Sequence, residues 1–238
     1  MSARAPDVER PRDATRESVR SSVFLCDFDG TIAPVDIGAA FARAFSPGGA
    51  AEQQELLGPW VRGEMGHREL TEAQCRLITA GAAEALAFTR GFGLDPHFAP
   101  FVREVRARGD RVMVVSEGFD FYVGDQLARA GLADVPFAAN RLRFEPGRVV
   151  PEFPWSAEGC GRCGNCKGQH VRHWRARGFE TALVGDGVSD RCGAREADRV
   201  IARGDLLEWC TREGIAAHQF GDFADVAAIA REWAGGVS

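Results

Sequence analysis

Residues 22–31 read SVFLCDFDGT, an apolar run that ends in two aspartates, a glycine and a threonine. A short apolar run that stops at a polar, glycine-containing turn is typical of a buried strand opening into a loop. Asp27 and Asp29 lie two residues apart directly after this run, so both carboxylates can reach the same edge of a sheet. The stretch therefore predicts a strand with acidic chemistry at its carboxyl end.

Other apolar runs repeat this pattern along the chain. Residues 111–115 stop at Ser116-Glu117-Gly118, residues 181–184 stop at Gly185-Asp186-Gly187, and residues 199–202 form a further candidate strand. Continuous apolar runs separated by helical stretches predict a parallel sheet that is covered on both faces. The fold class expected is α/β, a doubly wound, Rossmann-like parallel sheet, in which ligands bind beyond the carboxyl ends of the strands.

The connection between the first two strands is much longer than a crossover requires. Residues 37–100 are rich in Ala, Leu, Glu and Gln, and they predict a helical cap inserted after the first strand. The catalytic α/β core is then expected at residues 20–36 and 101–238, with residues 1–19 as a disordered arm. Residues 141–151 alternate around a Pro-Gly turn and predict a hairpin.

Composition excludes several classes of protein. The formal net charge of −5 argues against a general binder of nucleic acid or of an anionic membrane, because both need a positive surface. No apolar run is long enough for a membrane helix, and the first twenty residues do not resemble a targeting peptide. We therefore expect a cytoplasmic protein with no nucleic-acid or membrane partner and with its seven cysteines reduced.

The basic residues are almost all arginines. Of the 29 lysines and arginines, only Lys167 is a lysine. A compact ammonium differs from a planar guanidinium in shape and acidity, so a single retained lysine indicates a site where arginine cannot serve. The alternative is the chance survival of one surface lysine, and the motif around Lys167 favours the functional interpretation.

The acidic residues fit the transfer of a phosphoryl group. Asp27 could attack phosphorus while Asp29 handles protons, provided that a divalent cation neutralises the phosphate. Mg²⁺ prefers oxygen ligands in octahedral geometry, and Asp186 at another strand end is a natural further ligand. Lys167 would hold Asp27 ionised and stabilise charge in the transition state, and Asp190 could orient the lysine by a salt bridge.

The remaining polar residues at the strand ends could bind the substrate and its phosphate. Hydroxyl groups, backbone N–H groups of the glycine turns and the positive end of a helix expected after Ser116 would all face the phosphate. Each feature alone is weak, because acidic and hydroxyl residues also cap helices and fill turns. The predicted set for substrate and phosphate is Thr31, Ser116, Glu117, Gly118 and Asp190.

These motifs together resemble the haloacid-dehalogenase-like phosphatases. The residues that carry the resemblance are Asp27-Phe28-Asp29-Gly30-Thr31, Ser116, Lys167 and Gly185-Asp186-Gly187-Val188-Ser189-Asp190. The resemblance implies that Asp27 is phosphorylated and that Asp29 acts first as general acid and then as general base. It also implies that Mg²⁺ is held by Asp27, the Asp29 carbonyl and Asp186.

Finer features are similar to one branch of that superfamily. A helical cap after the first strand resembles the phosphoserine-phosphatase-like branch. Residues 115–122 (VSEGFDFY), residues 160–167 (CGRCGNCK) and residues 62–70 (RGEMGHREL) are similar to the methionine-salvage phosphatases that act on 2-hydroxy-3-keto-5-methylthiopentenyl-1-phosphate. The resemblance implies a small-molecule phosphate ester as substrate, and it leaves the oligomeric state open, a homodimer included.

Other functions stay open from the sequence. A phosphoserine phosphatase is the nearest, although such enzymes typically carry Glu where this chain has Asp36. A phosphotransferase of the same fold would need an acceptor other than water. A receiver-type signalling domain would need neither Asp29 nor a cap, and a non-catalytic binding protein would not need all the acidic residues intact.

Two smaller features carry alternatives of their own. Cys160, Cys163 and Cys166 have the spacing of a structural Zn²⁺ site, whose fourth ligand could be His170, His173 or Cys192. The alternative, a reduced loop that only positions Lys167, is favoured because no second C-x-x-C pair follows. In the cap, Glu64, His67 and Arg68 could face the substrate, but a solvated helix face is the safer interpretation, and Trp60 is expected in the core.

Overall fold

The computed structural model describes residues 21–156 and 160–235, so the arm expected at residues 1–19 lies outside the described residues. Within the described part, seven strands form one sheet in the order β4-β3-β2-β1-β5-β6-β7. All neighbouring strands are parallel except β3 and β4, which are antiparallel. The strands are β1 (Ser22–Cys26), β2 (Arg111–Phe119), β3 (Phe137–Glu145), β4 (Arg148–Glu152), β5 (Glu180–Gly185), β6 (Arg199–Ala202) and β7 (His218–Gln219).

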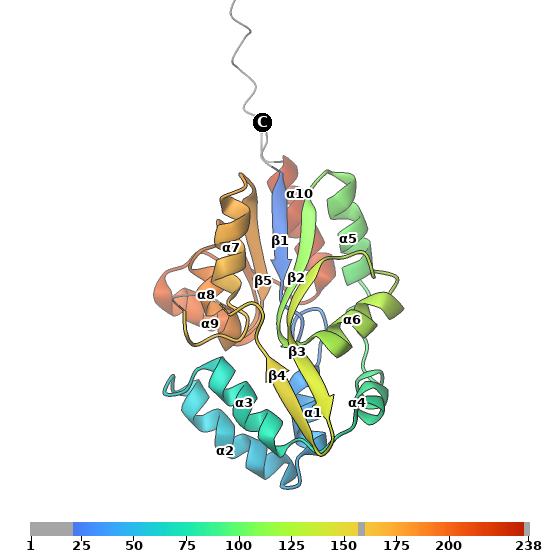
Figure 1. Cartoon of the computed structure of the whole chain (residues 1–238). Helices are drawn as coiled ribbons and strands as arrows, with labels where there is room; N and C mark the ends of the chain where they lie inside the picture. Colours follow the sequence, from blue (N-terminus) through green and yellow to red (C-terminus); the bar gives the residue numbers. More distant parts are fainter. Residues whose placement is uncertain (1–20, 157–159, 236–238) are drawn as a thin grey trace, which may run out of the picture.

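Helices cover both faces of the sheet and one of its ends (Figure 1). Apart from the short 3₁₀ turn Val188–Asp190, the helices are α1 (Ile37–Phe45), α2 (Gly49–Val61), α3 (His67–Leu77), α4 (Ala82–Thr89), α5 (Phe98–Ala107), α6 (Asp120–Arg129), α7 (Lys167–Arg175), α8 (Arg191–Ala194), α9 (Gly204–Glu213) and α10 (Phe223–Gly235).

The central strand β1 is buried on both faces, as its apolar run predicts. Phe24 and Cys26 pack into the hydrophobic cluster that includes residues of α5 and α10. Val23 and Leu25 point the other way, into the cluster that includes residues of α7 and α9. Burial on both faces explains why the strand is continuously apolar rather than alternating. The predicted doubly wound α/β fold is confirmed.

The end of β2 differs from the prediction. The strand expected to stop at Ser116 continues through Phe119, and the helix expected after Ser116 is α6, which begins at Asp120. The pairing of β2 with β3 shifts register between Val115 and Phe119, which leaves an irregular stretch of strand at Ser116-Glu117-Gly118. An irregularity of this kind redirects side chains at a strand end. The hairpin expected at residues 141–151 is confirmed as β3 and β4.

The helices α1 to α4 fall within the range predicted for the cap. Figure 1 shows α1, α2 and α3 beyond the end of β1 toward which that strand points, next to the extended strands β3 and β4. There α3 packs against β4, while α4 contacts both α1 and α6. The next helix, α5, begins at Phe98 and packs against β2 and α10 of the sheet layer. Among the described residues, no helix is both long enough and apolar enough to cross a membrane.

Candidate active site

A cavity of about 170 Å³ lies between the carboxyl ends of the central strands and the helices α1, α2 and α3. Strand-end side chains form its polar part, as expected where ligands bind in open α/β sheets. The acidic residues and the histidine that line it are Asp27, Asp29, Asp36, Glu117, Asp186 and His67.

Lys167 is the first residue of α7, and its side chain is only 1% exposed. Its Nζ lies 2.5 Å from Oδ1 of Asp27, donates to Ser189 Oγ at 3.3 Å and contacts Oδ1 of Asp190. Burial alone would lower the pKa of Lys167, but Asp190 and Asp27 raise it, so the amine stays charged. The chain's single lysine therefore bridges two buried carboxylates.

Three carboxylates meet beside this lysine. Asp27, Asp186 and Asp190 each offer an oxygen, and these oxygens lie within 4.8 Å of one another. Burial raises the pKa of Asp27 well above its usual range, and the charges of Asp190 and Asp186 raise it further while Lys167 opposes them. One ammonium against three carboxylates leaves a surplus of negative charge. Oxygen ligands with such a surplus fit a hard divalent cation such as Mg²⁺.

The loop after β1 is shaped around Asp186. The Thr31 hydroxyl donates to Oδ1 of Asp186 at 2.8 Å, and Thr31 is not among the residues that line the cavity. Gly30 adopts φ 79°, and a Cβ at this position would overlap the Asp186 carboxylate. Thr31, predicted to bind phosphate, is thus placed to orient Asp186.

The carboxylate of Asp29 does not belong to the group formed by Asp27, Asp186 and Asp190. Its Oδ1 accepts from the backbone N–H of Ile37 at 2.9 Å and of Gly38 at 3.3 Å, both in the first turn of α1. Its Oδ2 accepts from the Tyr122 hydroxyl at 2.6 Å. Burial, with a contribution from Asp36, raises the pKa of Asp29 to about 7 in spite of these hydrogen bonds. A carboxyl group with this pKa can both give and take a proton near neutral pH.

The irregular end of β2 places three predicted residues in the cavity lining, namely Ser116, Glu117 and Gly118. The Ser116 side chain is fully buried, and its Oγ accepts from the Gly118 N–H at 2.9 Å. A Cβ on Gly118 would overlap the Tyr122 hydroxyl, so glycine is required where Tyr122 reaches Asp29.

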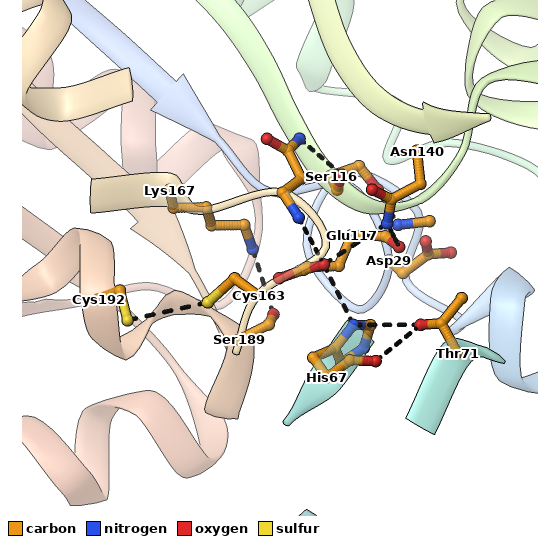
Figure 2. A network of polar contacts seen from close by, with 12 residues as sticks. Asp29, His67, Thr71, Ser116, Glu117, Asn140, Cys163, Lys167, Ser189 and Cys192 are labelled. Atoms are coloured by element: carbon orange, nitrogen blue, oxygen red, sulfur yellow. Dashed lines mark hydrogen bonds and ion pairs between the residues drawn. The ribbon is translucent and has the colours of Figure 1, made fainter. Parts of the chain in front are cut away.

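Glu117 connects the sheet to the cap, as Figure 2 shows. Its Oε2 lies 3.1 Å from Nδ1 of His67 on α3 and accepts from the Asn165 N–H at 2.9 Å. Burial would raise the pKa of Glu117, but His67 and the Asn165 N–H lower it, while Glu117 in turn raises the pKa of His67 against the effect of burial. Both shifts favour the charged forms of the pair. A negative Glu117 would repel phosphate, which favours contact with another part of the substrate.

The other cap candidates divide into two groups. Glu64 and Arg68 lie outside the cavity lining and pair with neighbouring residues at the surface. His67 and Trp60 both line the cavity, with their rings in edge contact at a centroid distance of 5.6 Å. The expectation that Trp60 belongs to the core is wrong, because its half-buried ring forms part of the cavity wall.

Several residues of the site were missed by sequence reasoning. Tyr122, which is fully buried, is the chain's only tyrosine. Asn165 is also fully buried; its side-chain amide donates to the backbone oxygens of Ser116 and Ala138 at 2.9 Å each. Asn165 lies two residues before the single lysine, inside the cysteine motif, and this proximity was the available signal. Asp190 forms the salt bridge with Lys167 that the sequence predicts, and its other oxygen accepts from the backbone N–H groups of Asp186 and Gly187 rather than facing phosphate.

Comparison with known proteins places this site in a family. The family model for haloacid dehalogenase-like hydrolases matches residues 24–195. The chain is 30% identical to a 2-hydroxy-3-keto-5-methylthiopentenyl-1-phosphate phosphatase of Brevibacillus brevis over 214 residues, covering 88% of this chain and 95% of the relative. A phosphatase of the same name from Exiguobacterium sp. is 30% identical over 87% of this chain and 96% of its own length.

Solved structures share the fold at lower sequence identity. A structure of the phospho-aspartyl intermediate analogue of phosphoserine phosphatase superposes with a TM-score of 0.68 at 21% identity, covering 88% of this chain and 99% of that chain. A substrate-bound phosphoserine phosphatase complex gives a TM-score of 0.67 at 20% identity, covering 88% and 98%. With its family model, its relatives and its fold in agreement, the chain belongs to the haloacid dehalogenase-like hydrolases.

Proposed function

We propose that this hydrolase is a Mg²⁺-dependent phosphatase that cleaves a small-molecule phosphate monoester through a phospho-aspartate at Asp27. The observation that carries the proposal is the buried contact between Lys167 and Asp27 at the inner end of the cavity. Lys167 occupies Oδ1 of Asp27, and among the described residues no side chain donates to Oδ2. Oδ2 is therefore the oxygen available for attack on phosphorus.

The reaction follows from the positions of two carboxylates. Asp27 Oδ2 forms a bond to phosphorus as the ester P–O bond breaks, and Asp29 gives its proton to the departing oxygen. Water then attacks the phosphorus of the phospho-aspartate, Asp29 takes up a proton from that water, and Asp27 and inorganic phosphate are released. The pKa of about 7 at Asp29 supports both roles, because the acid and base forms are then both populated near neutral pH.

Mg²⁺, which phosphatases of this family generally use, would be held by Asp27, Asp186 and the backbone carbonyl of Asp29. The bound cation would neutralise phosphate charge and keep the reacting groups in line. The cluster of carboxylate oxygens within 4.8 Å of one another supports this assignment. Asp190, which is paired with Lys167, would act beside the cation rather than on it.

The cap end of the cavity favours an uncharged, apolar part of the substrate. Its apolar lining includes Phe41, Ala42, Leu57, Trp60, Leu70 and Ile78. Within the described part of the chain, the lining contains no arginine and no lysine. The histidine of the lining, His67, already pairs with Glu117, so the carboxylate of phosphoserine would have no free cationic partner here, and burying an unpaired charge is costly. This lining therefore argues against phosphoserine as the substrate.

We infer that the substrate is the methionine-salvage enol phosphate for which the relatives are named. By its name, that compound carries hydroxyl and keto groups next to the phosphate and a methylthio group at the far end. The apolar cap lining suits the methylthio end. The His67–Glu117 pair lines the same cavity and offers both a donor and an acceptor for the hydroxyl and keto groups.

Phosphate release from a panel of esters tests the proposal. The panel contains an aryl phosphate, phosphoserine, the enol phosphate, phosphocholine and a sugar phosphate, each with and without Mg²⁺, and Asp27→Asn is the control. We expect Mg²⁺-dependent release that is fastest in kcat/KM for the enol phosphate and absent in Asp27→Asn. Preference for phosphoserine would overturn the assignment of the enol phosphate as substrate. Transfer of phosphate to an added alcohol in place of water would favour a phosphotransferase.

The cysteine loop takes no part in the proposed reaction. Cys160, Cys163 and Cys166 are not among the residues that line the cavity. Any Zn²⁺ held by these thiols would be structural.

A further inference from the structure

Four cysteines converge outside the cavity. The sulfurs of Cys160, Cys163, Cys166 and Cys192 all lie within 4.8 Å of one another. Figure 2 shows Cys163 and Cys192 facing each other, and their sulfurs are 4.0 Å apart. The first three come from the loop before α7, and the fourth comes from α8. We infer that these four thiolates bind a structural Zn²⁺, with Cys192 as the fourth ligand.

The geometry is close to that of a tetrahedral site. A Zn–S bond of about 2.3 Å places tetrahedral sulfurs about 3.8 Å apart, so closing the site requires shifts of about 1 Å or less. A disulfide would require two sulfurs at about 2.05 Å, which the 4.0 Å between Cys163 and Cys192 does not approach. Four protein ligands make a closed site, which is the structural rather than the catalytic type.

The alternative fourth ligands are engaged elsewhere. Nε2 of His170 lies 2.7 Å from Oδ1 of Asn165, and Nδ1 of His173 lies 2.8 Å from Nη1 of Arg177. Neither histidine belongs to the group of converging ligand atoms. The remaining cysteines, Cys26, Cys75 and Cys210, are buried in the hydrophobic clusters. The sequence could not choose among the three candidates, because Cys192 approaches the loop only through the packing of α8 against α7.

The ion would fix the residues that flank it. Cys166 is the N-cap of α7, whose first residue is Lys167, and Cys192 follows Asp190 by two residues. Zinc would thus fix both partners of the buried Lys167–Asp190 pair from outside the cavity. Arg162, which lies between two of the cysteines, donates to the Gly63 carbonyl at 2.5 Å and so joins the same loop to the cap. This positioning role rests on the proposed function, whereas zinc binding itself does not.

The test begins with the wild-type chain, purified under reducing conditions without chelators. We expect about one zinc per chain by mass spectrometry and an X-ray absorption spectrum with four sulfur neighbours at about 2.3 Å. Exchange with Co²⁺ should give the intense visible bands of a tetrahedral thiolate site. A chain that carries no zinc and takes none up from a buffered Zn²⁺ solution, or that contains a disulfide among these four cysteines, would overturn the inference.

Single variants identify the ligands. Cys192→Ser should lose most of the zinc, whereas Cys75→Ala, at a buried cysteine outside the group, should retain it. Full zinc content with four sulfur neighbours in Cys192→Ser would show that the fourth ligand is wrong. If Cys192→Ser fails to fold, the absorption and cobalt spectra of the wild-type chain still decide. Zinc without phosphatase activity would contradict the proposed function alone, and phosphatase activity without zinc would contradict this inference alone.

Discussion

The Tyr122 hydroxyl donates a hydrogen bond of 2.6 Å to Oδ2 of Asp29, and it thereby joins α6 to the loop that follows β1. The two residues are 93 positions apart in the sequence. This hydrogen bond favours the ionised form of Asp29, whose burial acts in the opposite direction. The balance between the two effects sets the pH at which Asp29 can act as an acid.

Tyr122→Phe should move that balance. Removing the donor raises the pKa of Asp29 above about 7. Because Asp29 must be protonated to act as an acid, kcat for an alkyl or enol phosphate should fall as pH rises through about 7 in the wild type. In the variant this decline should begin about one pH unit higher. Rate profiles between pH 5 and pH 9 measure the shift.

An aryl phosphate provides the control for this experiment. The leaving group of an aryl phosphate needs little protonation. With this substrate, the decline of kcat at alkaline pH should therefore be weak in both proteins. If kcat declines equally steeply with pH for both substrates, or declines at the same pH in Tyr122→Phe as in the wild type, a group other than Asp29 sets the pH dependence.

Lys167→Arg should inactivate the enzyme although the charge is kept. The ammonium is 1% exposed and fits between Asp27 and Asp190, where a guanidinium is too large. We expect kcat to fall roughly 100-fold or more. Lys167→Met would leave two buried carboxylates unpaired and should cost about 3–5 kcal/mol of stability. Arg172→Lys, on the exposed face of the same helix, is the control. If Lys167→Arg keeps activity within tenfold of wild type, the proposed catalytic role of the Lys167 ammonium is wrong.

Gly30→Ala should weaken the response to Mg²⁺. Gly30 has φ 79°, and a Cβ there would overlap the Asp186 carboxylate. Gly147→Ala is a matched control, since Gly147 has φ 75° with nothing within 4 Å of the added Cβ. Both variants carry the backbone strain of about 1–2 kcal/mol. Only Gly30→Ala should raise the Mg²⁺ concentration for half-maximal activity, by roughly tenfold or more. If the two variants need the same Mg²⁺ concentration, that result would count against Asp186 as a ligand.

Trp60→Ala should weaken the binding of the apolar end of the substrate but not the binding of its phosphate. Losing the ring from the cavity wall removes about 1.5–3 kcal/mol of apolar contact, or roughly 10- to 100-fold in kcat/KM for the enol phosphate. A substrate without an apolar tail should lose much less. Trp155→Ala is the control, because Trp155 is 38% exposed and lies outside the cavity lining. Equal losses on both substrates would place the tail elsewhere.

The sequence predicts the strand-end part of the site because parallel strands end at one edge of the sheet. Two of these residues, Asp27 and Asp186, follow recognisable apolar runs, and Lys167 directly follows the cysteine motif. The structure brings the three side chains together. The salt bridge predicted between Asp190 and Lys167 is present, but the contacts of Thr31 with Asp186 and of Asp190 with backbone N–H groups could not be predicted in the same way. Only the folded loops determine these directions.

Contacts that depend on irregular backbone also escaped prediction. The extension of β2 through Phe119 places Glu117 against His67 and Gly118 against Tyr122, and no periodicity in the sequence encodes that shift of register. Cys192 likewise reaches the cysteine loop only through helix packing. The cytoplasmic location stays a prediction.

Trapping the covalent intermediate tests the central claim most directly. The enzyme would be mixed with substrate and Mg²⁺, quenched in acid within one turnover and reduced with borohydride, which converts an aspartyl phosphate to homoserine. Peptide mapping should then find homoserine at position 27 in the wild type and in no peptide of Asp27→Asn. Normal turnover with no modification at Asp27, or with modification at another residue, would contradict the account.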